Sequence, residues 1–426
     1  MGELAVLFLL AYFFTLFAIS RRRRPDVLPA PDELFTVFTI PCLNEEAVIG
    51  GTLESLLALP GDDYAVLVVD DGSDDATAQI VRTYESERVH LVRRELPDAR
   101  RGKGAALNAA FHYLVDSELL AKRSPENVVM AVFDADGRIQ PEALSAMAGH
   151  FRDPRAGAVQ LQVEMRNANA NLLTRLQDME FVVFTEIFQR ARQRLGSVGL
   201  GGNGQFVRLS ALQSLGVEPW SDCLTEDLDL GVRLLLTGWT NNYCPTAAVS
   251  QQAVTGLRRW IRQRARWFHG HLQCWRLIPR ILRSRLSAAL VLDLLWYLLL
   301  PCWVLLIPLV GLPVLVGFAV YCFTAPGQAF GVLSADHGLV VLVLYLVMFG
   351  PAAYVSGPVY WLRGRVGLPK AIVLGHAFEL YSNFWLIAGW IAVFRVLRRK
   401  RGWAKTARVA ESNAQAAAPA TAGAPR

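Results

Sequence analysis

The sequence has few cysteines, and they form no pattern that would hold a metal or a disulfide framework. The six cysteines of this 426-residue chain are scattered, no CxxC pair occurs, and Cys302 and Cys322 lie in apolar runs. This distribution excludes a cysteine-rich metal or disulfide class and is typical of a reducing compartment. The chain also has no internal repeat.

Charged residues are scarce too, at 19% of the chain against 53% hydrophobic residues. Apolar blocks occur at residues 4–19 and again after residue 287, and the stretch between them has ordinary globular composition. We therefore expect a membrane protein with a soluble domain inserted between its spans. The net charge of +6 does not predict nucleic-acid binding, because the basic residues cluster at membrane borders, at 21–24, 258–266 and 395–401.

The apolar stretch 4–19 lacks two features of a signal peptide. Its basic residues, 21–24, follow the apolar core instead of preceding it, and no small-residue cleavage site intervenes. We predict an N-terminal transmembrane helix over 1–20, whose carboxyl end lies in the cytoplasm, and a basic linker over 21–34.

Strands and helices alternate after the linker. Apolar strands are predicted at 35–40, 64–69, 89–93 and 128–133, with helices between them, two of which Asn44 and Ser73 are expected to cap. This alternation predicts an α/β domain over 35–255 with a mostly parallel sheet. Ligands of such sheets bind beyond the carboxyl ends of the strands. Further helices are predicted at 171–195 and 226–236, with a glycine-rich loop at 199–204.

The remainder of the chain is predicted to lie at or in a membrane. Residues 256–285 mix Trp and Arg as an amphipathic interface helix does. Apolar blocks at 288–323, 338–361 and 371–394 predict about four spans within 286–397, the first block being broken near Pro301 or at 311–313. A basic, then disordered, cytoplasmic tail follows over 398–426. With the N-terminal helix this gives five spans, which leaves three basic residues outside, against the positive-inside rule: Arg363, Arg365 and Lys370.

Acidic residues follow two of the predicted strands. Asp134 and Asp136 can hold Mg²⁺ or Mn²⁺ against two phosphates, or they can form an ordinary acidic turn. Asp70 and Asp71 can accept from a base N–H or a ribose hydroxyl, while the same segment makes a strand-to-helix turn.

Three further sites each have a functional and a structural interpretation. Lys103 contacts a phosphate or lies in a solvated basic loop, and its loop does not match a Walker A pattern. The pair Glu226 and Asp227 opens a helix, where a carboxylate complements the helix N-terminus or acts as a base whose basicity that terminus would lower. Gln263, Arg266 and Trp267 share one helix face, which suits either a sugar diphosphate or a lipid interface.

Taken in order, PCLNEE (41–46), VVDDGSDD (68–75), FDADG, TED and QRARW closely resemble the motifs of family 2 glycosyltransferases. The resemblance covers residues 35–275. It is strongest to the membrane-bound branch with the cellulose, chitin and hyaluronan synthases. The single span before the soluble domain also resembles the layout of ceramide glucosyltransferases.

The resemblance implies a cytoplasmic domain of the GT-A type, an α/β, Rossmann-like fold with a mostly parallel sheet. It implies an inverting β-glycosyltransferase that uses a UDP-sugar, with Asp227 as the general base and Asp136 as the ligand of Mg²⁺ or Mn²⁺. The remaining residues would bind the nucleotide or the substrates: Pro41, Asn44, Glu45, Asp70, Asp71, Lys103, Asp134, Glu226, Gln263, Arg266 and Trp267.

Three functions remain open on the sequence. The first is a processive polysaccharide synthase of the plasma membrane that adds a hexose or N-acetylhexosamine and passes the polymer through its own multi-pass helices, with accessory export proteins as possible partners. The second transfers one sugar to a membrane lipid. The third is a transporter or channel with a non-catalytic domain. The expected partners are a UDP-sugar, a carbohydrate or lipid acceptor and membrane lipids, and no nucleic acid.

Overall fold

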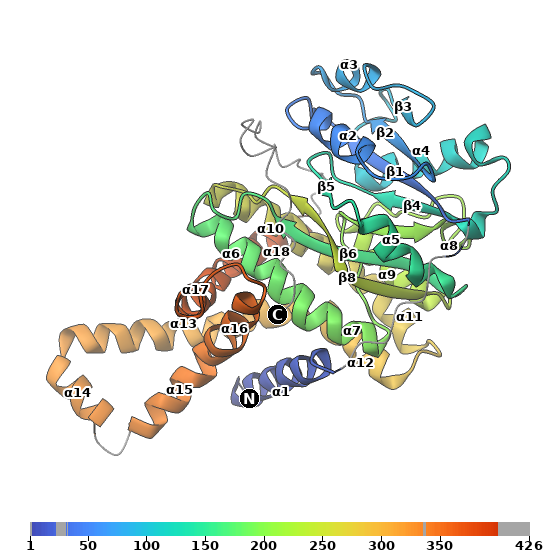
Figure 1. Cartoon of the computed structure of the whole chain (residues 1–426). Helices are drawn as coiled ribbons and strands as arrows, with labels where there is room; N and C mark the ends of the chain where they lie inside the picture. Colours follow the sequence, from blue (N-terminus) through green and yellow to red (C-terminus); the bar gives the residue numbers. More distant parts are fainter. Residues whose placement is uncertain (1, 23–30, 32, 335–337, 399–426) are drawn as a thin grey trace.

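The computed structural model describes residues 2–22, 31, 33–334 and 338–398, and its centre is an eight-stranded sheet (Figure 1). The strand order is β3-β2-β1-β4-β7-β6-β8-β5. The strands are β1 (Phe35–Cys42), β2 (Tyr64–Asp70), β3 (Val89–Arg93), β4 (Val128–Val132), β5 (Arg138–Ile139), β6 (Ala156–Met165), β7 (Gln205–Arg208) and β8 (Thr240–Gln251).

The sheet is mixed but mostly parallel, which confirms the predicted α/β class. β1 pairs in parallel with β2 and β4, β2 with β3, and β6 with β8, whereas β7 runs antiparallel to both β4 and β6. All seven residues of β2 and all five of β4 are buried, because helices cover both faces of the sheet.

Two apolar layers hold these helices on the sheet. On one face, α2 (Ile49–Leu57), α3 (Thr77–Arg82) and α5 (Ala143–Ala148) pack on β1, β2 and β4. On the other face, α4 (Lys103–Asp116), α8 (Leu209–Gln213) and α9 (Glu226–Leu236) do the same. Because these helices occupy the two faces of the sheet, the carboxyl ends of its strands are left for loops and later helices to cover.

Two predicted helix caps are wrong. Helix α2 begins after Val48 and α3 after Ala76, and neither has a side-chain cap. Asn44 and Ser73 instead join the two strand-end loops: the Asn44 backbone N–H donates to Ser73 Oγ (2.9 Å), and Asn44 Oδ1 accepts from the Asp74 backbone N–H (2.9 Å). Each side chain therefore accepts a hydrogen bond from a backbone N–H of the other loop, and neither caps its own helix.

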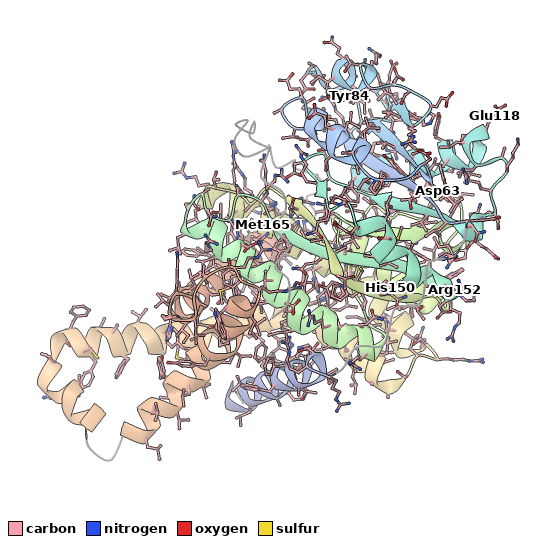
Figure 2. All side chains as sticks on the ribbon, in the orientation of Figure 1. Asp63, Tyr84, Glu118, His150, Arg152 and Met165 are labelled. Atoms are coloured by element: carbon pink, nitrogen blue, oxygen red, sulfur yellow. The ribbon has the colours of Figure 1, made fainter. Side chains whose placement is uncertain are left out.

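The helix predicted at 171–195 is present and contains a π-helical insertion. Asn171 caps α6 (Leu172–Val183), the π-helix η4 (Phe184–Gln189) follows, and α7 (Arg190–Leu195) completes it. The predicted interface helix is α10 (Leu257–Gln273), continued by the short helices η5 (Cys274–Leu277) and α11 (Ile278–Leu282). Met165, at the end of β6, lies beside α6 (Figure 2), and its N–H donates to Asp178 Oδ1 (3.2 Å).

The apolar segments also form helices. They are α1 (Gly2–Ser20), α12 (Ala288–Leu298), α13 (Leu300–Thr324), α14 (Pro326–Ser334), α15 (Gly338–Gly350), η6 (Pro351–Ser356), α16 (Gly357–Leu362), α17 (Leu368–Ser382) and α18 (Phe384–Leu397). Figure 1 shows α13, α14 and α15 extending away from the sheet. The bend of 46° between α12 and α13 lies at Leu299, next to Pro301, rather than at 311–313.

Length and composition identify fewer spans than the five predicted. Within the described residues, 342–362 and 368–397 are long and apolar enough to cross a membrane, and the bent pair α12–α13 makes a third if it counts as one span. The part of α1 that this criterion covers, Leu7–Ser20, is apolar but shorter than the criterion requires. Arg23, Arg24 and the predicted tail from residue 399 lie outside the described residues.

Candidate active site

A cleft of about 430 Å³ opens at the carboxyl ends of β1, β2 and β4. The strand register brings these ends together: Cys42 pairs with Asp70 and Thr39 with Val132, so the residues after β4 meet those at the end of β1. Most residues predicted for the site line this cleft: Pro41, Glu45, Asp71, Lys103, Asp134, Asp136, Glu226, Asp227, Gln263, Arg266 and Trp267.

Asn44 and Asp70 are not among the lining residues and shape the loops behind the cleft. Asp70 is fully buried; its Oδ1 accepts from the Ser73 N–H (3.0 Å), and its Oδ2 lies 3.5 Å from Arg93 Nε. Asn44 has a left-handed backbone (φ 54°), which suits the tight turn after β1. Asp71 forms an ion pair with Arg94, and burial nevertheless raises the pKa of the Asp71 carboxyl. Of the adjacent aspartates, therefore, Asp71 is the one presented to a ligand.

Lys103 lies among the acidic groups of the cleft. Its Nζ is 2.7 Å from Asp134 Oδ1, donates to the Gly202 carbonyl (2.7 Å) and lies 3.9 Å from Glu226 Oε1. Burial opposes its charge, but Asp134 and Glu226 outweigh burial and raise the pKa of Lys103. The solvated-loop alternative is therefore wrong: Lys103 is a held cation within the cleft.

Asp136 and Asp134 supply two carboxylates at the end of β4. Asp136 is fully buried, and its Oδ2 accepts from the Gln252 N–H (2.9 Å). Among the described residues, no group of three or more His, Cys, Asp or Glu side chains could hold a metal by itself. Carboxylate oxygens suit Mg²⁺ or Mn²⁺, and a cation here would take its other ligands from the phosphates of a bound nucleotide.

Glu226 and Asp227 form the first turn of α9 and behave differently from the expectation for a helix N-terminus. Asp227 Oδ1 accepts from the Leu228 N–H (2.8 Å), which favours the charged form. The charges of Lys103 and Arg266 also favour the charged form. Burial outweighs all three influences and raises the pKa of Asp227. Burial and then the Asp227 charge raise the pKa of Glu226 to about 7. The predicted lowering of basicity is therefore wrong, because desolvation dominates the helix N-terminus.

The glycine-rich loop 199–204 closes the cleft above these acids. Gln160 fixes it, accepting from the Gly201 N–H (2.7 Å) and donating to the Asn203 carbonyl (2.9 Å). A Cβ placed on Gly202 would lie 3.1 Å from Lys103 Nζ and 3.2 Å from Asp227 Oδ2. A side chain at 202 would therefore enter the space beside Asp227. The sequence pattern marked this loop, but gave no sign of the Gln160 anchor on β6.

Helix α10 presents Gln263, Arg266 and Trp267 to the cleft, as its periodicity predicts. Arg264, between them in the sequence, is 1% exposed, and its Nη1 donates to Gln263 Oε1 (3.0 Å). Its guanidinium lies 2.7 Å from Glu180 Oε2 and 4.1 Å from the Trp267 ring centroid. The buried Arg264 guanidinium therefore packs on the Trp267 ring and fixes its position. Sequence reasoning missed this role.

Helices distant in the sequence also line the cleft, with mostly apolar residues and with the polar side chains Glu180, Thr185 and Gln189. His271 also lines the cleft; burial lowers its pKa to about 4, so it is neutral, and its Nε2–H donates to the Tyr297 carbonyl (2.7 Å). The apolar residues come from α6, η4, α10, α13 and α18: Phe181, Phe184, Phe268, Leu300, Pro301, Val304 and Trp385. None of these was predicted as a site residue, because no local motif connects them.

A family model described as "Glycosyltransferase like family 2" matches residues 31–270, more than half of the chain. The chain belongs to glycosyltransferase family 2. The matched segment ends within α10, and it therefore contains the whole sheet together with the QRARW residues. The resemblance stated for the motifs is confirmed at the level of the family.

Curated relatives within the family have more than one kind of product in their names. A beta-monoglucosyldiacylglycerol synthase from Synechocystis is 35% identical over 244 residues, which cover 55% of this chain and 48% of that protein. A poly-beta-1,6-N-acetyl-D-glucosamine synthase from Staphylococcus aureus is 28% identical over 263 residues, covering 61% and 60%. The chain spans about half the length of the first of these relatives.

The GT-A fold is shared with a solved structure. The mannosyltransferase PcManGT from Pyrobaculum calidifontis, in complex with GDP-Man and Mn²⁺, aligns with a TM-score of 0.56 at 17% identity, over 94% of this chain and 100% of that one. At this identity the likeness concerns the fold alone, and it confirms the predicted GT-A class.

Proposed function

We propose that the chain is an inverting β-glycosyltransferase that transfers a hexose or N-acetylhexosamine from a UDP-sugar to a membrane lipid. The observation that carries the proposal is the two-sided cleft. Its strand-end side is lined by carboxylates and Lys103, and its far side by apolar residues of the helices that follow the catalytic domain. The name of the Synechocystis relative, a glycolipid synthase, supports a lipid acceptor.

The strand-end side suits the donor. Asp71 would accept from the uridine, with Pro41 and Glu45 beside it, and Arg266 would contact the diphosphate. Asp134 and Asp136 would hold Mg²⁺ or Mn²⁺, which would neutralise charge on the leaving diphosphate. The Mn²⁺ and GDP-Man in the PcManGT structure support a cation with the nucleotide sugar. Asn44 and Asp70, predicted as ligand contacts, would act by shaping this side.

The chemistry requires one proton transfer and one displacement. The acceptor hydroxyl gives its proton to Asp227, whose raised pKa makes it a stronger base than an exposed aspartate. The acceptor oxygen then bonds to the anomeric carbon from the face opposite the diphosphate. The carbon–oxygen bond to the diphosphate breaks, and its electron pair leaves with UDP. A single displacement inverts the anomeric centre, so an α-linked donor gives a β-linked product.

The far side suits the acceptor. Trp267 offers a ring for a sugar or a glycerol group, and Leu300, Val304 and Trp385 offer an apolar surface to the first part of an acyl chain. The processive synthase with coupled export stays the competing prediction, and the name of the Staphylococcus relative supports it. We place the catalytic domain on the cytoplasmic face of the plasma membrane, where UDP-sugars are available.

The test is purified full-length protein in vesicles with a panel of radiolabelled UDP-sugars and diacylglycerol. We expect labelled product in the organic phase with one sugar per lipid, at a rate that needs Mg²⁺ or Mn²⁺. High-mass aqueous product would establish the polymer synthase instead. No transfer with any donor, from protein that still binds UDP, would favour a non-catalytic domain on a transporter.

A further inference from the structure

Helices α17 and α18 form one helical segment, 368–397, that is long and apolar enough to cross a bilayer. At 1.5 Å per residue its 30 residues extend about 45 Å. If a segment crosses a membrane, one of its two ends lies on the side opposite the soluble domain. Contacts along α17–α18 show the opposite, because it touches the catalytic domain at its beginning and middle, and the interface helix α10 at its middle and end.

The beginning is the loop between α16 and α17. Arg363 donates to Gln162 and Glu186 of the catalytic domain, and Arg365 lies 2.6 Å from Glu164. Arg21, which directly follows α1, donates to the backbone carbonyl of the same Glu186 (2.8 Å). Since Arg21 and Arg363 both bind Glu186 of the catalytic domain, the end of α1 and the 363–367 loop lie on the catalytic domain's side.

The middle of the segment lies on α6 and α10. Tyr381 donates its hydroxyl to Glu180 of α6 and accepts from Trp260 Nε1 of α10 (2.8 Å). The Trp385 ring lies 5.9 Å from the Trp260 ring and 5.3 Å from the Arg264 guanidinium. Glu180 belongs to the catalytic domain, and Trp260 and Arg264 belong to the interface helix α10, so the middle of the segment still lies against both.

The end of the segment follows α10 as far as its last turns. A Cβ placed on Gly389 would lie 3.0 Å from the Phe268 ring, so the two helices are in close contact there. His269 directly follows Phe268 on α10. Burial and then the nearby charge of Arg395 lower the pKa of His269. As α10 advances from Trp260 to His269, the contacts on the other helix advance from Tyr381 to Arg395. The two helices therefore run side by side in the same direction.

The outer face of α17–α18 is apolar and periodic. Val373, Leu380, Ile387 and Phe394 recur every seven residues, and all four are exposed, at 67%, 53%, 47% and 55%. One face of the helix thus carries a continuous apolar stripe, while the other lies on α6 and α10. Figure 1 shows α13 and α15 reaching away from the sheet, whereas α17 lies beside α6 and α18 beside α10. Basic residues flank the segment at both ends, at Lys370 and Arg398.

We propose that α17–α18 does not cross the membrane but lies along its interface, with the apolar stripe on the acyl chains and both ends on the catalytic domain's side. Amphipathic helices lie at this depth, and their flanking basic residues meet the lipid headgroups. The arrangement also removes the charge conflict of the five-span topology. Arg363, Arg365 and Lys370 then lie on the same side as the catalytic domain, as the positive-inside rule prefers.

The two ends of the segment give a direct test. Gly367→Cys and Arg398→Cys place one thiol at each end; Gly367 has open space around it, and both positions are exposed. Ser86→Cys marks the catalytic domain, and Gln328→Cys marks α14, both at exposed positions. Full-length variants in sealed vesicles of known orientation are treated with a membrane-impermeant maleimide. The parent chain gives the background of its own six cysteines.

We expect the thiols at 367 and 398 to label from the same side as the thiol at 86, and the thiol at 328 to label from the other side. Opposite labelling of 367 and 398 would overturn the proposal and make the segment a span. Labelling in detergent confirms that each thiol reacts. Lys370→Cys and Leu397→Cys, also exposed, replace an end whose first variant does not label or fold. The outcome does not depend on the sugar or on the acceptor.

Discussion

The two sides of the cleft differ in how the chain builds them. The donor side consists of short contiguous motifs, each placed at the end of a strand, and its residues are charged and joined by ion pairs. The acceptor side takes single residues from helices between Phe181 and Trp385, and it is mostly apolar. Under the proposed function, the sheet would fix the nucleotide chemistry, whereas the packing of the later helices would select the acceptor.

The largest loss of activity is expected at Asp227, the proposed base, because transfer between the donor and the acceptor depends on it. Asp227→Asn removes the base and keeps the shape, so turnover should fall about 10³-fold while UDP binding is retained. Initial rates and UDP titration by calorimetry measure the two. Asp222→Asn, an exposed change in the preceding loop, is the matched control and should leave both unchanged. Comparable turnover in the two variants would remove Asp227 as the base.

The next change breaks the donor side alone. Lys103→Met removes the cation that lies beside Asp134 and Glu226 in the cleft. We expect kcat/KM for the UDP-sugar to fall about 10²-fold, because the electrostatic stabilisation of the donor phosphates by this cation is lost. The KM for the lipid should stay constant. Lys122→Met, at an exposed position, is the control. A selective loss of lipid affinity would contradict the division of the cleft.

A smaller change breaks the acceptor side alone. Trp385→Leu shortens the apolar wall, and we expect the KM for the lipid to rise about tenfold, as for a lost apolar contact in a pocket. The KM for the UDP-sugar should not change. Trp390→Leu, on the same helix but 39% exposed and not in the cleft, is the matched control. An equal effect of both substitutions would assign Trp385 to membrane contact instead.

The smallest effect sharpens the boundary between the two sides. Burial and the Asp227 charge raise the pKa of Glu226 to about 7, so Glu226 gains a proton as the pH falls through that value. Ionised Glu226 strengthens the neighbouring base, and we therefore expect kcat/KM to fall several-fold below about pH 7. In Glu226→Gln this step should vanish, leaving an acid limb about one pH unit lower or more. An unchanged profile would show that Glu226 does not control the base.

The sequence predicted which residues gather at the strand ends of the cleft, because local patterns determine them. Buried strands specify the sheet, and the sheet aligns the residues at its strand ends, so the sequence pattern alone could group Asp71, Asp134 and Asp136. The failures have physical causes. Asn44 and Ser73 bond to each other's loops rather than to helix ends, and desolvation at Asp227 exceeds the helix-terminus effect. The wall formed by Phe184, Val304 and Trp385 depends on packing between distant helices, which no local pattern contains.

The convergence of arginines on Glu186 has a consequence for the time course of biosynthesis. This buried carboxylate, in the π-helical turn of η4, meets Arg190 within the same turn of chain, but Arg363 lies 177 residues later. At a synthesis rate of about 5–20 residues per second, Arg363 is made roughly 10–35 s after Glu186. Trp385 follows later still. The nascent sheet can thus be ready for a nucleotide sugar well before the apolar wall that includes Trp385 exists. Under the proposed function, the enzyme becomes competent only near the end of translation.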